Sequence, residues 1–150
     1  MQPPPDASHI SIGALIAQVG RQWRRALNRR LQSSGLTEAT WLPLLYLYRA
    51  ATPMRQKDLA AAIALESSSI VRLLDELQAA GLVERRESSD RRARDVHITR
   101  RGRQLAQEVE HLSSALREEL LASIAPDDLE TAEQVLRQLS TALTTDEAAS

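Results

Sequence analysis

The sequence lacks cysteine and phenylalanine and has only two Trp and two Tyr. The absence of cysteine excludes disulfides, thiolate nucleophiles, cysteine-ligated zinc and sensing by thiol oxidation. With so few aromatic residues, the core must be built from Leu, Ile, Val and Ala. No apolar run approaches the ~20 residues that span a bilayer. Residues 1–6 lack the basic and apolar blocks of a secretory signal, so we expect a cytoplasmic protein.

Residue patterns typical of enzymes and metal sites are also missing. The three histidines are scattered, and none has the partner spacing of an H-E-x-x-H metal site. Gly13 and Gly20 form no phosphate-binding loop. The acidic pairs at 118–119 and 127–128 are adjacent in sequence and so do not converge on one substrate. We therefore expect no catalytic residues, no metal ligands and no cofactor.

Charge is distributed unevenly along the 150 residues. The net charge is only −1, but residues 84–103 carry eight basic and four acidic side chains. Residues 104–150, in contrast, carry two basic and ten acidic side chains. This asymmetry favours two surfaces with different partners. The alternative is ordinary solvated charge on exposed helix faces.

The spacing of apolar residues predicts a mainly α-helical chain with about six helices. Residues 1–9 are expected to be a disordered lead. The expected helices cover residues 10–34, 38–48, 56–63, 67–80, 100–124 and 126–143, with residues 144–150 frayed. Gly81 is expected to adopt the left-handed conformation that ends a helix, and Thr99 to cap the next one.

A change of period after Gly81 predicts a β-hairpin. Its strands are expected at 82–86 and 96–99, around the polar, turn-prone segment 87–95. Two short helices joined by a tight turn and followed by a hairpin make a winged helix-turn-helix. We expect this lobe to occupy residues 36–103, with a wing of two or three strands.

The winged-helix pattern points to DNA binding because a helix fits the major groove and its first turn faces the base edges. Ser67, Ser68 and Ser69 open one such helix, and Arg72 follows one turn later. The serines are small enough for close approach, whereas Arg72 can reach a guanine edge or a phosphate. The alternative is that the serines only cap the helix.

The expected hairpin turn is rich in arginine. Arg91, Arg92 and Arg94 are suited to the negative potential of a narrow minor groove. We expect Asp90 to form an ion pair with Arg92 and so stiffen the turn. The alternative is a solvated basic loop with no nucleic-acid partner.

Several segments together resemble the MarR family of transcription regulators, over roughly residues 10–143. The Asp-Arg-Arg-Ala sequence of the wing and the Ile-Thr-x-x-Gly start of the next helix are specific to that family. The segments that carry the resemblance are 57–60, 69–77, 80–85, 89–94 and 98–102. Residues 23–27, 36–37 and Trp41 resemble the SlyA branch.

The resemblance implies an obligate homodimer formed by helices within 10–34 and 104–145. It implies a repressor that binds a pseudo-palindromic double-stranded operator. The positions implied or expected to contact DNA are Gln56, Lys57, Ser67, Ser68, Ser69, Arg72, Asp90, Arg91, Arg92 and Arg94. Arg55 replaces a hydroxyl residue common before the helix at 56, and a Pro common near Ser68 is absent.

Many members of the family respond to small aromatic acids. The matching positions here are Arg21, Trp41 and Arg72, which suit a carboxylate and an aromatic ring. The alternative is that Trp41 belongs to the core and Arg21 to a surface ion pair. Two other functions stay open: a helical dimerisation or adaptor protein that binds no DNA, and a regulator without a small-molecule ligand that displaces another DNA-binding protein.

Overall fold

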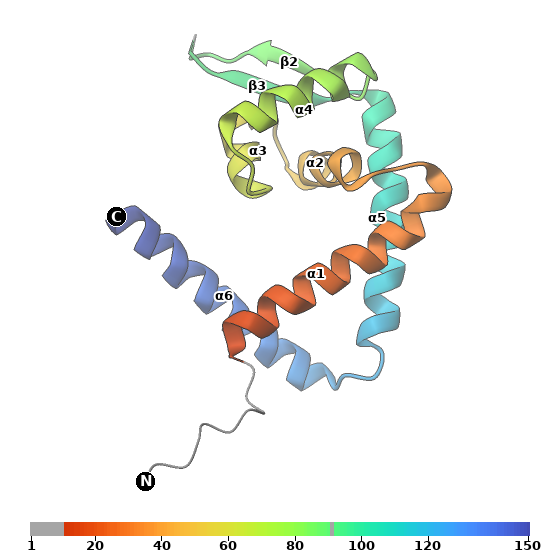
Figure 1. Cartoon of the computed structure of the whole chain (residues 1–150), viewed down its shortest axis with the longest axis vertical. Helices are drawn as coiled ribbons and strands as arrows, with labels where there is room; N and C mark the ends of the chain where they lie inside the picture. Colours follow the sequence, from red (N-terminus) through yellow and green to blue (C-terminus); the bar gives the residue numbers. More distant parts are fainter. Residues whose placement is uncertain (1–10, 91) are drawn as a thin grey trace. The chain divides into compact units, whose positions relative to one another are not determined.

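The computed structural model describes residues 11–90 and 92–150 (Figure 1). The expected lead at 1–9 lies outside this part. The elements are α1 (Ile12–Leu31), a 3-10 turn η1 (Gln32–Ser34), α2 (Glu38–Arg49), β1 (Met54–Arg55), α3 (Gln56–Ala62), α4 (Ser67–Ala79), β2 (Val83–Glu87), β3 (Arg94–Ile98), α5 (Arg100–Leu121) and α6 (Pro126–Ala149). The chain forms two compact units that divide between Ser114 and Ala115, within α5.

A three-stranded antiparallel sheet in the order β1-β3-β2 forms the wing. In the β2–β3 hairpin Val83 lies opposite Ile98, and Glu87 lies opposite Arg94. The short strand β1 pairs with β3 through Met54 and Val96. The predicted winged helix is therefore confirmed, and the wing has three strands. Sequence patterns placed no strand at β1 because two residues are too few to show a period.

One hydrophobic core joins the helices of the lobe to this sheet. It consists of buried Leu, Ile, Val and Ala side chains, as the scarcity of aromatic residues requires. Its members are Leu44, Leu47, Leu59, Ala60, Ile70, Leu74, Leu77, Leu82, Val83, Val96 and Ala106. Figure 1 shows α4 running alongside the β2–β3 hairpin. Burial of Ile70, Leu74 and Leu77 on one face of α4 leaves the opposite face of that helix exposed.

Two left-handed residues turn the chain at the ends of α3 and α4. Ala64 has φ of 56°, and Gly81 has φ of 74°, as predicted for a glycine that ends a helix. The Leu82 amide donates to the Leu77 carbonyl at 3.0 Å. This bond turns the chain directly from α4 into the first wing strand.

The start of α5 is joined to that same turn. Thr99 Oγ1 donates to the Gly81 carbonyl at 2.7 Å and accepts from the Gly102 amide at 3.0 Å. The Thr99 amide donates to the Leu82 carbonyl at 3.1 Å. The predicted cap at Thr99 is therefore confirmed, and it also connects α5 with the end of α4.

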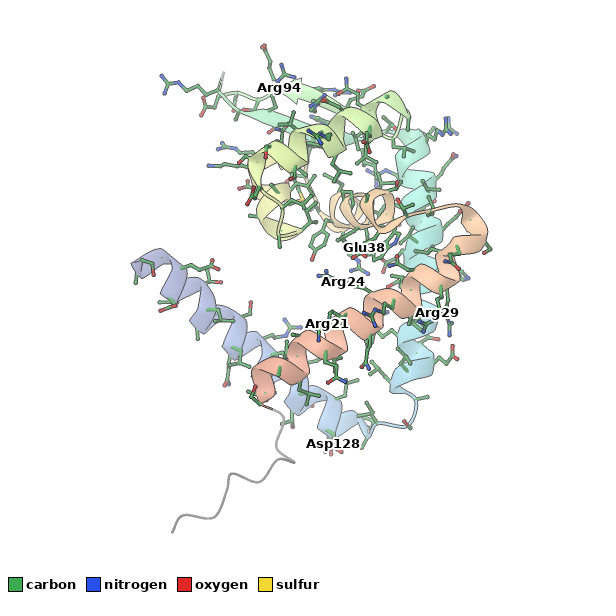
Figure 2. The ribbon with its side chains drawn as sticks, viewed as in Figure 1. Arg21, Arg24, Arg29, Glu38, Arg94 and Asp128 are labelled. Atoms are coloured by element: carbon green, nitrogen blue, oxygen red, sulfur yellow. The ribbon has the colours of Figure 1, made fainter. Side chains whose placement is uncertain are left out.

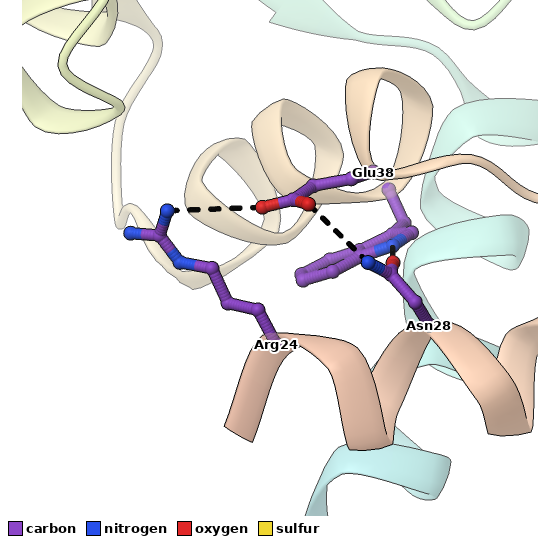
Figure 3. A network of polar contacts seen from close by, with 4 residues as sticks. Arg24, Asn28 and Glu38 are labelled. Atoms are coloured by element: carbon purple, nitrogen blue, oxygen red, sulfur yellow. Dashed lines mark hydrogen bonds and ion pairs between the residues drawn. The ribbon is translucent and has the colours of Figure 1, made fainter. Parts of the chain in front are cut away.

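Polar contacts connect α1 with α2 (Figure 3). The buried Trp41 donates from Nε1 to Asn28 Oδ1 at 2.7 Å. Asn28 Nδ2 donates to Glu38 Oε2 at 3.2 Å, and Arg24 lies 3.7 Å from the other Glu38 oxygen. Because Asn28 is half-buried and satisfies the indole N–H, this network fixes how α2 packs on α1.

The ends of the last two helices correct two sequence-based predictions. Residues 144–150 were expected to be frayed, but α6 continues to Ala149. No glycine or proline follows Pro126 to end the helix, and the Thr144 and Thr145 hydroxyls donate to carbonyls one turn earlier. The fifth helix was expected to reach residue 124, but α5 ends at Leu121.

Candidate nucleic-acid interface

The beginning of α4 presents its serines to solvent. Ser67, Ser68 and Ser69 are all exposed and form the first turn of the helix. The N-cap is Glu66, whose side chain makes no capping hydrogen bond. The alternative in which the serines cap the helix is therefore wrong. The first amides of a helix have no partner within it, so this turn combines free N–H groups with small hydroxyl side chains.

A shallow hollow of about 280 Å³ lies on the exposed face of α4. Its lining residues are Ser68, Ser69, Arg72, Leu73 and Glu76. The predicted contact Arg72 is thus exposed next to two of the predicted serines. A cationic side chain beside small hydroxyls gives this face donors for a base edge or a phosphate.

A second hollow, of about 470 Å³, lies between the start of α3 and the wing. Its lining residues are Arg55, Gln56, Lys57, Asp90, Arg92, Ala93 and Arg94. Five predicted DNA contacts are therefore brought together although more than thirty residues separate the two segments. The pairing of β1 with β3 causes this, because it places Arg55 opposite Asp95. We call this group the basic hollow.

Arg55 belongs to the basic hollow but was not among the predicted contacts. In the sequence it stands out only as a departure from the usual residue before α3. In the structure Arg55 is the N-cap of α3 and makes no side-chain capping bond. With Lys57, Arg92 and Arg94 it gives the hollow four cationic side chains against the single carboxylate of Asp90. The sequence signal that could have identified Arg55 as a contact is an arginine at the position just before a helix.

The turn at the tip of the wing is held by hydrogen bonds that its backbone amides donate. The Asp90 carboxylate accepts from the Arg92 backbone amide at 3.2 Å, and the Ala93 amide donates to the Asp90 carbonyl at 2.9 Å. Ser88 Oγ accepts from the Asp90 amide at 3.1 Å. Asp side chains commonly stabilise turns in this way. The predicted ion pair of Asp90 with the Arg92 guanidinium is therefore wrong, and Arg91 lies outside the described residues.

Figure 2 shows Arg94 on the wing and Arg21 on α1. Of the residues predicted to bind a ligand, Arg21 and Arg72 are exposed on α1 and α4. Trp41 is only 2% exposed, which agrees with the alternative that it belongs to the core. Asn28, which is the hydrogen-bond partner of the indole N–H, was not among the predicted site residues.

Within residues 11–90 and 92–150, no group of three or more His, Asp and Glu side chains is arranged to hold a metal ion. In the same part of the chain, none of the helices combines the length and apolar character needed to cross a membrane.

A helix-turn-helix followed by a hairpin that pairs with β1 in a three-stranded wing, with a basic hollow between α3 and the wing, defines a winged-helix protein. A family model described as MarR family matches residues 34–93. Transcriptional regulator PA3341 is 34% identical, with a TM-score of 0.84, and the match covers 90% of this chain and 99% of that one. The chain therefore belongs to the MarR family of transcriptional regulators.

Two further solved structures resemble the chain over most of their length. A MarR-family transcriptional regulator from Rhodococcus sp. RHA1 is 29% identical with a TM-score of 0.73, and the match covers 85% of this chain and 91% of that one. CouR from Rhodococcus jostii RHA1, bound to p-coumaroyl-CoA, is 27% identical with a TM-score of 0.73. That match covers 86% of this chain and 91% of CouR.

Proposed function

We propose that this MarR-family regulator is a sequence-specific repressor that binds double-stranded DNA through α4, the start of α3 and the wing. The observation that carries the proposal is the basic hollow, in which two segments distant in sequence present four cationic side chains on one surface. Arginine and lysine beside a groove-reading helix are the groups that bind DNA phosphates and base edges. The exposed serines and Arg72 supply the part of the surface that recognises sequence.

We propose further that the protein acts as a homodimer, joined by helices within 10–34 and 104–145. Exposed apolar side chains support this arrangement, because water-facing stripes of this kind mark interaction surfaces. On α1 they are Ile12, Leu15, Ile16 and Val19, and on α6 they are Val135, Leu136 and Leu143. A two-fold dimer matches a pseudo-palindromic operator with half-sites one helical turn apart. Occlusion of a promoter is the resulting mode of repression.

Two alanine variants test the proposed DNA surface on the duplex that the wild-type protein selects from a random-sequence pool, here called the selected duplex. Arg92→Ala is expected to weaken binding to all sequences, because Arg92 is exposed in the basic hollow and is proposed to contact the DNA phosphate backbone. The slope of log affinity against log salt should become shallower by about 0.9 per lost phosphate contact. Arg72→Ala is expected to relax discrimination at one base pair by about 1–3 kcal/mol.

Arg29→Ala is the matched control, because Arg29 is exposed on α1, away from the proposed surface (Figure 2). Its affinity and salt slope should equal those of the wild type. Binding by both test variants at wild-type strength would refute the proposed surface. A wild-type protein that selects no duplex would instead support the adaptor function. DNA binding without repression, combined with competition against another bound protein, would support regulation by displacement.

We propose that an aromatic carboxylate or its acyl thioester releases the protein from DNA through the exposed Arg21 and Arg72. Trp41 is buried in the free chain, so its ring contacts the ligand only if binding makes this side chain accessible. The support is the CouR relative, whose bound p-coumaroyl-CoA carries an aromatic acyl group, and the exposed arginines at two of these positions.

Titration with benzoate, hydroxybenzoates, p-coumarate and p-coumaroyl-CoA tests this ligand class. Binding is expected to change the fluorescence of the two tryptophans, Trp23 and Trp41, and to release the selected duplex. Benzyl alcohol, which has the ring without the carboxylate, should do neither. Arg21→Ala should keep DNA binding and lose the response. A panel that leaves both fluorescence and DNA binding unchanged would contradict the proposed ligand.

A further inference from the structure

One arginine of the wing is directed at the recognition helix α4 and not at solvent. The Arg85 side chain on β2 is 13% exposed. Its Nε donates to Gln78 Oε1 at 2.9 Å, and its Nη2 forms an ion pair with Asp75 Oδ1. Asp75 and Gln78 are three residues apart and therefore lie on the same side of α4.

The next residue, Arg86, shows that this arrangement is specific. Its side chain is 61% exposed and bonds Glu84 Oε2 at 2.9 Å, within the same strand. Adjacent residues of a strand face opposite sides of the sheet, so the pleat directs Arg85 toward α4 and Arg86 away from it. Two arginines of identical chemistry thus make different connections, and only Arg85 joins two elements.

The position of Arg85 matters because the two elements that it connects, α4 and β2, lead to the two parts of the proposed DNA surface. Asp75 lies two turns after the exposed serines of α4, and β2 leads from Arg85 to the wing tip within five residues. Arg85 also lies opposite Val96, a core residue. The planar guanidinium offers donors in a fixed fork, so a single side chain can hold both acceptors, which a lysine ammonium cannot match.

We propose that Arg85, held by Asp75 and Gln78, is a positioning residue that sets the spacing between the recognition helix and the wing. This inference rests on the proposed DNA-binding function. Arg85 acts through the two elements it joins and does not itself touch DNA. Without Arg85, each element can still bind phosphates. The two elements are then no longer spaced to enter adjacent grooves of the cognate sequence together.

A double-mutant cycle with Arg85→Met and Asp75→Asn tests this role. The measured quantity is selectivity, defined as the affinity for the selected duplex divided by the affinity for a scrambled duplex. Each single variant is expected to lose about 10-fold in selectivity, and the double variant no more than either single, since coupled residues are not additive. Arg85→Lys should lose less selectivity than Arg85→Met but should not reach the wild-type value. Arg86→Met is the matched control and should keep wild-type selectivity.

Asp75→Asn separates positioning from direct contact. If Arg85 bound a phosphate itself, removing the neighbouring carboxylate would leave selectivity intact and strengthen binding to both duplexes, which would overturn the inference. If Arg85 had a merely structural role, the variant would melt at a lower temperature and bind both duplexes more weakly in parallel. The selectivity would then be unchanged, and this result would also overturn the inference. If Arg85→Met does not fold, Asp75→Asn alone decides. Failure of the wild type to select a duplex would refute the proposed function and is distinct from each of these outcomes.

Discussion

Replacing Gly102 with alanine is expected to lower the free energy of unfolding of the winged-helix lobe by about 3 kcal/mol, the upper end of the usual range for overpacked sites. A Cβ at this position would lie 2.1 Å from the Leu82 carbonyl oxygen and 3.0 Å from Ile98 Cγ1. The obstructing atom is a backbone oxygen and cannot rotate away. It also accepts the hydrogen bond of the Thr99 amide, so relieving the contact would disturb one of the bonds that connect α5 with the end of α4.

Urea denaturation followed by circular dichroism measures this loss as a lower midpoint. The control is Gly13→Ala on α1, where an added Cβ meets no atom within 4 Å. This control should raise the free energy of unfolding by no more than about 1 kcal/mol, because alanine has a higher helix propensity than glycine. If Gly102→Ala were as stable as the wild type, the close approach of α5 to Leu82 would be refuted.

Replacing Ser68 with glutamate is expected to weaken binding to the selected duplex roughly 100-fold or more, because juxtaposed like charges cost several kcal/mol in an interface. Ser68 is exposed in the first turn of α4 and lines the hollow that contains Arg72. The fold should not suffer, because a carboxylate in the first turn of a helix interacts favourably with the helix dipole. The variant therefore separates DNA binding from stability.

Fluorescence anisotropy of a labelled duplex measures the loss, and thermal melting shows that the protein remains folded. Ser33→Glu is the matched control, since Ser33 is exposed in η1, outside the proposed surface. It introduces the same charge and should change the affinity little. If Ser68→Glu retained wild-type affinity while folded, the first turn of α4 would not be in the groove.

The elements of the lobe were predictable from local chemistry. The apolar period locates α4, and Gly81 marks its end because the left-handed conformation there favours glycine. Thr99 announces α5 because a threonine side chain satisfies free amides at a helix start. The basic residues of the hairpin were recognisable from charge alone. In each case a few neighbouring residues determine the outcome.

Features that depend on contacts across the chain were not predictable. The pairing of β1 with β3 brings Arg55 and Lys57 to the wing, but two residues carry no strand signal. The Asp90 carboxylate had an arginine and a backbone amide within reach, and the turn geometry favours the amide. Arg85 and Arg86 look alike in sequence, and only the register of β2 distinguishes them.

The order of residues was enough to specify helices, caps, a hairpin and an uneven distribution of charge, because each follows from spacing and propensity over one or two turns. Which charged side chains share a surface was settled by strand pairing and by the packing of α4 against the wing. Those contacts join residues far apart along the chain, and their energies depend on burial and hydrogen-bond geometry that no local pattern records. In this protein, those long-range contacts produce the basic hollow and the connection that Arg85 makes between β2 and α4.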